Sequence, residues 1–438
     1  MAHKISFLKV SKSGEYLVEE DEKPFFWLGD TAWELLHRLD LKDTELYFRD
    51  RKEKGFNVIQ TVILAELDGL NIPNANGDQP LVHLDPEQPN EDYFAHVDKV
   101  VRLAGEMGIY IGLLPTWGDK YNKKWGIGPE VFNPENAESF GKFLGNRYKD
   151  QNNIIWILGG DRIPDNEEDY LINCRLAQGL RKGNAKHLQS LHPNGGQIAS
   201  DIFGKEAWLD IDMFQSRHQK GFKEFKFTRK ARKNRPVRPV IDGEPGYENI
   251  PNLLNKLHLQ RLDDKDVRKA AYWNMCCGAA GHTYGCNELW QIYSPENQGL
   301  FGAHFHWKEA LNLPGAIQVG MMKQFFESLP WQTLIPDQTI IGGFNWENSA
   351  HITGMVNREK DLLLAYSPSG RTIKLNTFPE GENIIHGFWF DPEKGLLKAL
   401  EQPYNNRLVV PDKKKDWILL MMSDKRAIEW KPPFPFME

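Results

Sequence analysis

The sequence predicts a (β/α)8 barrel followed by a small antiparallel β-sandwich. The chain of 438 residues is longer than one ordinary hydrophobic core accommodates, so two domains are expected. Up to about residue 330, apolar runs of strand length alternate with segments of helical spacing, as in an α/β barrel. Beyond Pro330, short apolar runs between turn residues are typical of a sandwich: 351–356, 362–366, 372–375, 386–391, 408–410 and 417–421. We therefore expect a barrel with an N-terminal hairpin over residues 1–330 and the sandwich over residues 331–438.

The elements of the barrel follow one another in a regular order. Residues 5–24 alternate apolar and polar positions around Ser13-Gly14, which predicts a hairpin. Apolar runs then predict eight strands, at 25–30, 56–65, 109–114, 153–158, 187–192, 211–216, 239–242 and within 281–290. Apolar residues three or four positions apart predict helices at 41–55, 94–107, 140–148, 169–182, 267–280 and 316–328. A doubly wound sheet would give a similar order, so the order alone does not establish closure.

Residues at the ends of these runs favour the barrel. In a barrel, the carboxyl ends of all the strands meet at one mouth. Each predicted strand here ends at, or is followed by, a residue suited to binding or transforming a ligand: Asp30, Glu66, Trp117, Asp161, His192, His218, Glu244 and Glu288. Residues 67–90 are rich in Asn, Pro, Gly and Asp, and a loop of that length is usually functional or disordered.

Charge and composition limit the classes of partner. The net charge of −6 does not suggest a general polyanion-binding surface. Residues 220–238 carry nine Lys or Arg in nineteen positions, which suits either nucleic-acid binding or a solvated helix face; the acidic whole favours the second. The sequence has no apolar segment of about 18 residues, so no membrane partner is expected. Aromatic residues make up 12% of the chain, with 14 Trp, which suits stacking on sugar rings or an aromatic-rich core. The oligomeric state stays open.

No cofactor or metal is expected. The sequence contains no GxGxxG, phosphate-binding loop or GxSxG motif, and its His spacings are irregular. The four cysteines, which form no CxxC motif, are expected to be reduced thiols: Cys174, Cys276, Cys277 and Cys286. Residues 1–24 lack an apolar run long enough for a signal peptide, so we expect a cytoplasmic location, with a removed leader as the alternative.

Asp161 and Glu244 are the strongest candidates for chemistry. They follow the fourth and seventh predicted strands, which lie across the mouth of a barrel from each other. Glycoside hydrolysis needs two carboxyl groups that flank one bond: one protonates the leaving oxygen, and the other attacks the anomeric carbon or activates water. The competing interpretation is structural, with Asp161 as a helix cap or a partner of Arg162 and Glu244 as a polar turn residue.

Other polar and aromatic residues near the predicted mouth are candidates for binding substrate. Asp30 is equally suited to capping the helix that follows it, and Glu66 to a structural ion pair. Arg217 and His218 are interpreted as a hydrogen-bonding pair in a polar pocket. The complete predicted binding set is Asp30, Trp33, Glu66, Trp117, His192, Arg217, His218, Tyr247, Tyr284, Asn287, Glu288 and Trp290.

Five motifs in order give the chain a family resemblance over roughly residues 5–430: KPFFWLGDTAWELLHRL, GFNVIQTVILAELDGLN, IIWILGGD, IDGEPGYE and GHTYGCNELWQIY. The chain resembles glycoside hydrolase family 140, which contains the domain of unknown function numbered 4038 and a C-terminal β-domain labelled collagen-binding. The resemblance implies a (β/α)8 barrel with a β-sandwich and an apiosidase activity on rhamnogalacturonan II. It also implies that Asp161 is the acid/base and Glu244 the nucleophile of a retaining enzyme.

Two departures qualify this implication. Many retaining barrels carry an Asn-Glu pair after the fourth strand, whereas this chain has Gly160-Asp161. The absent signal peptide suggests an imported oligosaccharide as the substrate rather than the pectic polymer. The expected function is therefore an exo-acting β-apiosidase on pectic oligosaccharides, and the alternatives are a glycosidase for another sugar and a non-catalytic carbohydrate-binding barrel.

Overall fold

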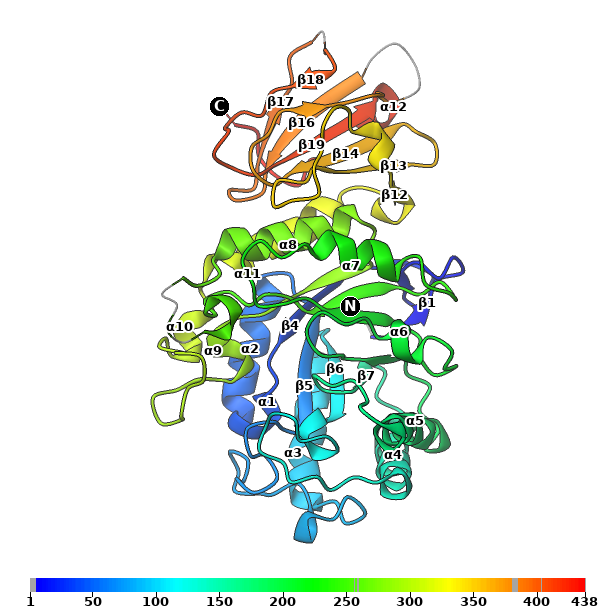
Figure 1. The fold of residues 1–438 in the computed structure, drawn as a ribbon, viewed down its shortest axis with the longest axis vertical. Helices are drawn as coiled ribbons and strands as arrows, with labels where there is room; N and C mark the ends of the chain where they lie inside the picture. The colour runs from blue at the N-terminus through cyan, green and yellow to red at the C-terminus, as the bar shows by residue number, and fades with distance from the viewer. Residues whose placement is uncertain (1–4, 256, 258–259, 380–384, 403, 438) are drawn as a thin grey trace.

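The computed structural model describes residues 5–255, 257, 260–379, 385–402 and 404–437 (Figure 1). The outer limits of the two predicted domains, residues 1–4 and residue 438, lie outside this range. In Figure 1 the barrel occupies the lower part of the molecule, and a sheet formed by the C-terminal part of the chain lies against the helices on its upper side.

Eight parallel strands form the barrel in the described chain: β4 (Trp27–Thr31), β5 (Val58–Leu64), β6 (Tyr110–Thr116), β7 (Ile154–Leu158), β8 (Gln189–Leu191), β9 (Asp212–Gln215), β10 (Val240–Glu244) and β11 (Gly281–Tyr284). A continuous sheet runs β11-β4-β5-β6-β7-β8, and β9 pairs with β10. Irregular hydrogen bonds complete the ring. The amides of Asp210 and Ile211 donate to the Gln189 carbonyl at 2.9 and 3.2 Å, and the Ala280 amide donates to the Val240 carbonyl at 2.9 Å. The predicted (β/α)8 barrel is confirmed.

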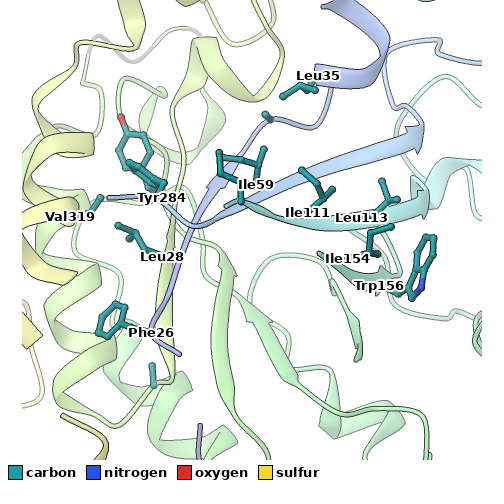
Figure 2. Close-up of a cluster of buried hydrophobic side chains, with 14 of the residues drawn as sticks. Phe26, Leu28, Leu35, Ile59, Ile111, Leu113, Ile154, Trp156, Tyr284 and Val319 are labelled. Carbon is teal, nitrogen blue, oxygen red and sulfur yellow. The ribbon is translucent and has the colours of Figure 1, made fainter. Parts of the chain in front are cut away.

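The barrel strands are apolar because both of their faces are buried. Every residue of β5 is buried, which explains the unbroken run VIQTVIL. One set of side chains fills the barrel interior, and the other packs against the surrounding helices. Figure 2 shows this second layer, in which side chains such as Leu28, Ile59, Ile111 and Trp156 face outward from the strands.

Helices surround the strands: α1 (Leu35–Arg38), α2 (Leu41–Glu53), α3 (Glu91–Glu106), α4 (Pro134–Tyr148), α5 (Glu167–Lys182), α6 (Ser200–Phe203), α7 (Glu224–Ala231), α8 (Asp264–Cys276), α9 (Asn287–Trp290), α10 (Trp307–Ala310) and α11 (Pro314–Glu327). Asp or Asn side chains accept backbone N–H groups at the starts of five of them, at Asp40, Asn90, Asn133, Asn166 and Asp263. None of the helices in the described parts of the chain has the length and apolar character needed to span a bilayer.

The C-terminal part forms a six-stranded antiparallel sheet in the order β12 (Leu334–Pro336), β13 (Thr353–Asn357), β14 (Leu362–Ser367), β19 (Trp417–Ser423), β16 (Ile385–Asp391) and β17 (Leu396–Ala399). One face packs on the barrel, where Phe390 stacks on Phe325 of α11 with centroids 4.5 Å apart. The other face forms a second core with the small sheet of β15 (Ile373–Lys374) and β18 (Arg407–Leu408). A short helix, α12 (Asp424–Glu429), follows β19. The expected antiparallel β-domain is confirmed.

Several elements differ from the sequence prediction. The predicted hairpin is the first part of a three-stranded sheet of β1 (Lys9–Val10), β2 (Leu17–Val18) and β3 (Pro24–Phe25). The predicted eighth strand ends at Tyr284, and β12 and β17 were not predicted. The described connections contain five 3-10 turns: η1 (Val82–Leu84), η2 (Gly118–Lys120), η3 (Asn252–Leu254), η4 (Trp331–Thr333) and η5 (Gln338–Ile340).

The basic stretch at 220–238 contains α7, and much of its charge is paired. Lys226 and Arg229 both contact Glu347 of the C-terminal part, at 2.8 and 3.3 Å. Lys230 pairs with Asp201, and Arg232 pairs with Glu15. These cations therefore form ion pairs with other parts of the fold, whereas the side chains of a purely solvated helix face would contact only water.

Candidate active site

A cavity of about 540 Å³ opens at the carboxyl ends of the barrel strands. Both candidate carboxyl residues line it, together with seven of the predicted binding residues: Trp33, Glu66, Trp117, Arg217, His218, Tyr247 and Trp290. Its volume lies within the roughly 300–1,000 Å³ typical of small-ligand sites. The structure thus brings most of the predicted mouth together in one place.

A local irregularity of β10 directs Glu244 into this cavity. The pairing of β10 with β9 shifts register between Asp242 and Glu244. Gly243 occupies the irregularity, where an added Cβ would lie 2.2 Å from Met213 Sδ. Gln60 Nε2 donates to the Gly243 carbonyl at 2.7 Å and fixes the strand there. A side chain at position 243 would displace the Met213 thioether, so the glycine of the GEP motif lets β9 and β10 pack closely beside Glu244.

Two histidines hold the carboxylate of Glu244. His192 Nδ1 accepts the backbone N–H of Asp161 at 2.9 Å, and His218 Nδ1 accepts that of Tyr247 at 3.3 Å. In each neutral ring the proton therefore lies on Nε2. His218 Nε2 then donates to Glu244 Oε1 at 3.2 Å. His192 Nε2 lies 2.9 Å from Oε2, off the direction of a linear hydrogen bond, so the N–H dipole of this ring faces the second carboxylate oxygen.

Asp161 lies at the end of a tight left-handed turn after β7. Gly159, Gly160 and Asp161 have φ values of 89°, 71° and 57°. At Gly160 an added Cβ would also approach Gly118 N to 2.8 Å. A left-handed conformation is uncommon for a residue with a side chain and is often found at functional sites. The Asp161 N–H is fixed by His192, and its Oδ2 accepts Trp125 Nε1–H at 2.6 Å.

The environments of the two carboxyl groups move their pKa values in opposite directions. Burial raises the pKa of Asp161, and the nearby charge of Glu244 raises it further, beyond what His192, Trp125 and Arg162 offset. Burial would also raise the pKa of Glu244, but the contacts from His192 and His218 outweigh this effect and lower it. Below the raised pKa of Asp161, which lies at about 6, the arrangement therefore favours a proton on Asp161 and a charge on Glu244.

Glu66 supplies a third carboxyl group to the cavity. It follows β5, and burial raises its pKa well above the usual range, with further contributions from Asp161 and Glu34. A neutral Glu66 carboxyl can both donate and accept hydrogen bonds. It is therefore suited to a substrate hydroxyl group without adding a second anion beside Glu244.

Trp125 is the main residue that the sequence analysis missed. It lies in the loop after β6, not at a strand end, and its ring covers the Arg162 guanidinium at 4.0 Å. The loop is fixed by the buried Asp119, whose Oδ2 accepts the amides of Ile127 and Gly128 at 3.0 and 2.8 Å. The only sequence signal was the abundance of Trp, which does not select one position.

An apolar wall faces part of the cavity and was also missed. It consists of Ile250, Leu253, Leu254 and Phe301, from the segments after β10 and β11. Leu253 and Leu254 have φ values of 59° and 56°, and Leu253 is 55% exposed. The remaining unpredicted lining residues are polar or small: Asn194, Gly195, Gln215 and Ser216.

Asp30 and Tyr284 lie outside the cavity, contrary to their predicted role in binding substrate. They are paired in register on β4 and β11, and both side chains point into the helix layer. Asp30 Oδ2 accepts Tyr47 Oη–H at 2.6 Å and Arg51 Nη1–H at 3.2 Å. Tyr284 Oη donates to Glu248 Oε2 at 2.7 Å. Asp30 is therefore neither a helix cap nor a ligand contact, but part of a buried ion pair.

Three further predicted residues also do not line the cavity. Glu288 Oε1 accepts Asn249 Nδ2–H at 2.7 Å, and Asn287 Nδ2 donates to the Phe301 carbonyl at 3.2 Å. These contacts support the loops around the mouth. His192 contacts Glu244 but does not line the cavity. No group of three or more His, Cys, Asp or Glu residues suited to a metal ion occurs in the described part of the chain.

Comparisons with known proteins agree with this geometry. Residues 11–333 match the family model "Apiosidase-like, catalytic domain", and residues 335–422 match "Putative collagen-binding domain of a collagenase". A solved structure described as a glycoside hydrolase aligns with a TM-score of 0.87 at 30% identity, over 96% of this chain and 97% of that one. A glycoside hydrolase family 5 structure from Bacteroides vulgatus aligns with a TM-score of 0.87 at 29% identity, over 96% and 94%.

A family 5 mannosidase from Rhizomucor miehei, at 12% identity and a TM-score of 0.51 over 73% of this chain and 97% of that one, shares the fold alone. A comparison with curated protein sequences gave no match. The first family model covers well over half of the chain, and the barrel carries the carboxyl pair that such enzymes require. The chain belongs to the apiosidase-like family of glycoside hydrolases.

Proposed function

We propose that this glycoside hydrolase is a retaining enzyme in which Asp161 is the acid/base and Glu244 the nucleophile. The observation that supports the two roles is the opposite shift of the two pKa values within one cavity. Retaining and inverting hydrolysis both need one protonated and one ionised carboxyl group at the scissile bond, and the choice of retention follows the family resemblance of the GGD and GEP motifs. Asp161 and Glu244 meet this requirement at mildly acidic pH, below the raised pKa of Asp161.

In the first step, Glu244 attacks the anomeric carbon while Asp161 gives its proton to the leaving oxygen. The new bond joins Glu244 to the sugar, and the bond from the sugar to the aglycone breaks. The contacts from His192 and His218 keep Glu244 ionised and fix both of its oxygens. Holding the nucleophile in a productive orientation lowers the entropic part of the barrier.

In the second step, Asp161 accepts a proton from water, and the oxygen of that water displaces Glu244 from the sugar. Esterification of Glu244 removes its negative charge, which is one of the causes of the raised Asp161 pKa. The pKa of Asp161 should therefore fall in the intermediate. This change suits the exchange of Asp161 from acid to base.

We assign the substrate as a β-linked apiosyl residue at the end of a rhamnogalacturonan II-derived oligosaccharide. The family description supports apiose, and the cavity of about 540 Å³ suits a short terminal segment better than a long polymer. Trp33, Trp117 and Trp290 offer apolar ring surface against which a sugar can pack.

A panel of rhamnogalacturonan II oligosaccharides tests this assignment. The released sugar is identified by chromatography, and its first-formed anomer by NMR before mutarotation. Apiose released as the β-anomer is the expected result. Release of another sugar would refute the specificity, and first formation of the α-anomer would refute retention.

Variants test the two roles separately. E244Q should lose on the order of 10³-fold or more in kcat on every substrate. D161N should lose as much on natural oligosaccharides but much less in the glycosylation of aryl glycosides, whose leaving group needs no proton. D201N, which changes an exposed carboxylate of α6, is the matched control and should leave turnover unchanged.

A further inference from the structure

The C-terminal part carries two exposed aromatic side chains that the fold does not need for packing. Phe344 is 85% exposed and Trp346 is 68% exposed, in the loop between η5 and β13. Their rings are nearly parallel, with an interplanar angle of 12° and centroids 6.2 Å apart. Adjacent exposed apolar groups mark an interaction site more often than scattered ones do. We infer that the Phe344–Trp346 pair is a carbohydrate-binding surface separate from the catalytic cavity.

The loop that presents the two rings is held from the side of the sheet. Asn345 Oδ1 accepts the Ile352 amide at 2.9 Å, and Asn345 Nδ2 donates to the Ile352 carbonyl at 2.7 Å. Arg371 donates to the Phe344 carbonyl at 2.9 Å and to the Ala350 carbonyl at 3.1 Å. These bonds fix the backbone on both sides of Trp346.

The barrel holds the same loop from the other side. Glu347, between Trp346 and Asn348, pairs with Lys226 and Arg229 of α7 at 2.8 and 3.3 Å. His351 Nδ1 donates to the Trp346 carbonyl at 3.2 Å, and the His351 ring stacks on Phe225 of α7, with centroids 4.5 Å apart. Figure 1 shows α7 on the side of the barrel that faces the sheet. A surface fixed in advance loses little conformational entropy when a ligand binds.

The geometry favours a sugar chain as the ligand. An exposure of 85% means that Trp346 covers little of the Phe344 ring, so ring surface is open to a ligand. The C–H face of a pyranose is apolar, and packing it on an aromatic ring removes apolar area from water. The charged edge of Glu347, which is itself half exposed, lies within the same loop and can accept hydrogen bonds from hydroxyl groups.

A second consideration favours carbohydrate over a protein ligand. Extended Pro-rich peptides are typically bound in aromatic-lined grooves, whereas these rings protrude from the surface. The barrel of the same chain acts on carbohydrate. A second sugar-binding surface on one rigid molecule would raise the local concentration of substrate chains near the cavity.

Affinity electrophoresis of the full-length enzyme tests the inference. The gels contain soluble pectin, galactomannan, hydroxyethylcellulose or gelatin, and the retardation of migration gives an apparent Kd. The variant F344A/W346A removes both rings, and the single variants F344S and W346S separate them. I428A is the matched control, because Ile428 is 78% exposed on α12 and belongs to neither the loop nor the cavity. Thermal unfolding and hydrolysis of a small soluble glycoside verify that each variant is folded.

The expected result is retardation by at least one polysaccharide, about tenfold weaker for F344A/W346A and unchanged for I428A. Hydrolysis of the small glycoside should be the same for all of them. Three outcomes would overturn the inference: no retardation of the wild-type enzyme by any polysaccharide, equal retardation of wild type and F344A/W346A, or a ring-dependent retardation by gelatin alone. The last outcome would assign the surface to a collagen-like protein ligand.

Discussion

His192 joins Asp161 to Glu244 through the two nitrogens of one imidazole ring. Its Nδ1 accepts the Asp161 amide at 2.9 Å, and its Nε2 lies 2.9 Å from Glu244 Oε2. The ring is fully buried and lies against Trp33 and Trp117, with centroids 5.2 and 5.8 Å away. One side chain thus sets the backbone of the proposed acid and the charge of the proposed nucleophile.

Replacing His192 with Phe should impair activity in a pH-dependent way. The substitution removes a group that lowers the pKa of Glu244, so that pKa should rise. The acidic limb of the kcat/KM profile should therefore move to higher pH, because Glu244 must be ionised to react. At the optimum we expect a loss on the order of 100-fold. H386F, in the C-terminal sheet, is the control; a lower activity of H192F with an unmoved acidic limb would refute the proposed role.

Trp125 should control the basic limb of the kcat/KM profile against pH. Its indole N–H donates to Asp161 Oδ2 at 2.6 Å and thereby favours the ionised form of Asp161. In W125F the pKa of Asp161 should rise. Asp161 should then keep its proton to higher pH, and the basic limb should move to higher pH. W290F also changes a ring that lines the cavity, but Trp290 Nε1 lies 3.4 Å from Asn287 Oδ1 and makes no bond to Asp161. The same upward shift in W290F would count against this explanation.

Asp30 should matter for stability and not for turnover. In D30A the buried Arg51 guanidinium loses a partner at 3.2 Å, and Tyr47 loses an acceptor at 2.6 Å. Breaking a buried ion pair by removing one partner costs about 3–5 kcal/mol. We expect a lower free energy of unfolding in urea, with kcat/KM of the folded enzyme within about threefold of wild type. A large rise in KM at unchanged stability would instead indicate that Asp30 contacts the substrate.

The difference between the predicted and the observed position of Asp30 shows how far the sequence could predict the site. The strand ends are readable because buried parallel strands are continuous apolar runs, and this placed Asp161 and Glu244 at one mouth. The direction of each side chain depends on the alternation within a strand, and a continuous apolar run conceals that alternation. Asp30 and Tyr284 therefore looked like ligand contacts, although both face the helix layer.

Loop residues were unpredictable for a different reason. Trp125 reaches Asp161 only because the buried Asp119 and Arg162 fix the shape of the loop that carries it. Such contacts join residues far apart in the sequence and leave no periodic pattern. The histidine contacts to Glu244 are similar: His192 and His218 were recognised as strand-end residues, but their shared partner emerged only from the three-dimensional arrangement.

Glu224 at the start of α7 should make stability fall as pH rises. The side chain is buried, and burial raises its pKa to about 8, against a partial offset from Lys269. The folded state therefore holds a proton that the unfolded state releases near its ordinary pKa of 4.5. Between about pH 4.5 and 8 the folded state binds more protons, so the free energy of unfolding decreases with pH across this window.

The E224Q variant tests this explanation, because glutamine has nearly the shape of glutamate but does not titrate. The free energy of unfolding of E224Q should exceed that of wild type by roughly 2–5 kcal/mol at pH 8.5 and by much less at pH 4.5. Urea unfolding at both pH values measures this difference. E45Q, which changes an exposed glutamate of α2, is the control, and an E224Q difference that does not grow with pH would mean that Glu224 is ionised in the folded protein.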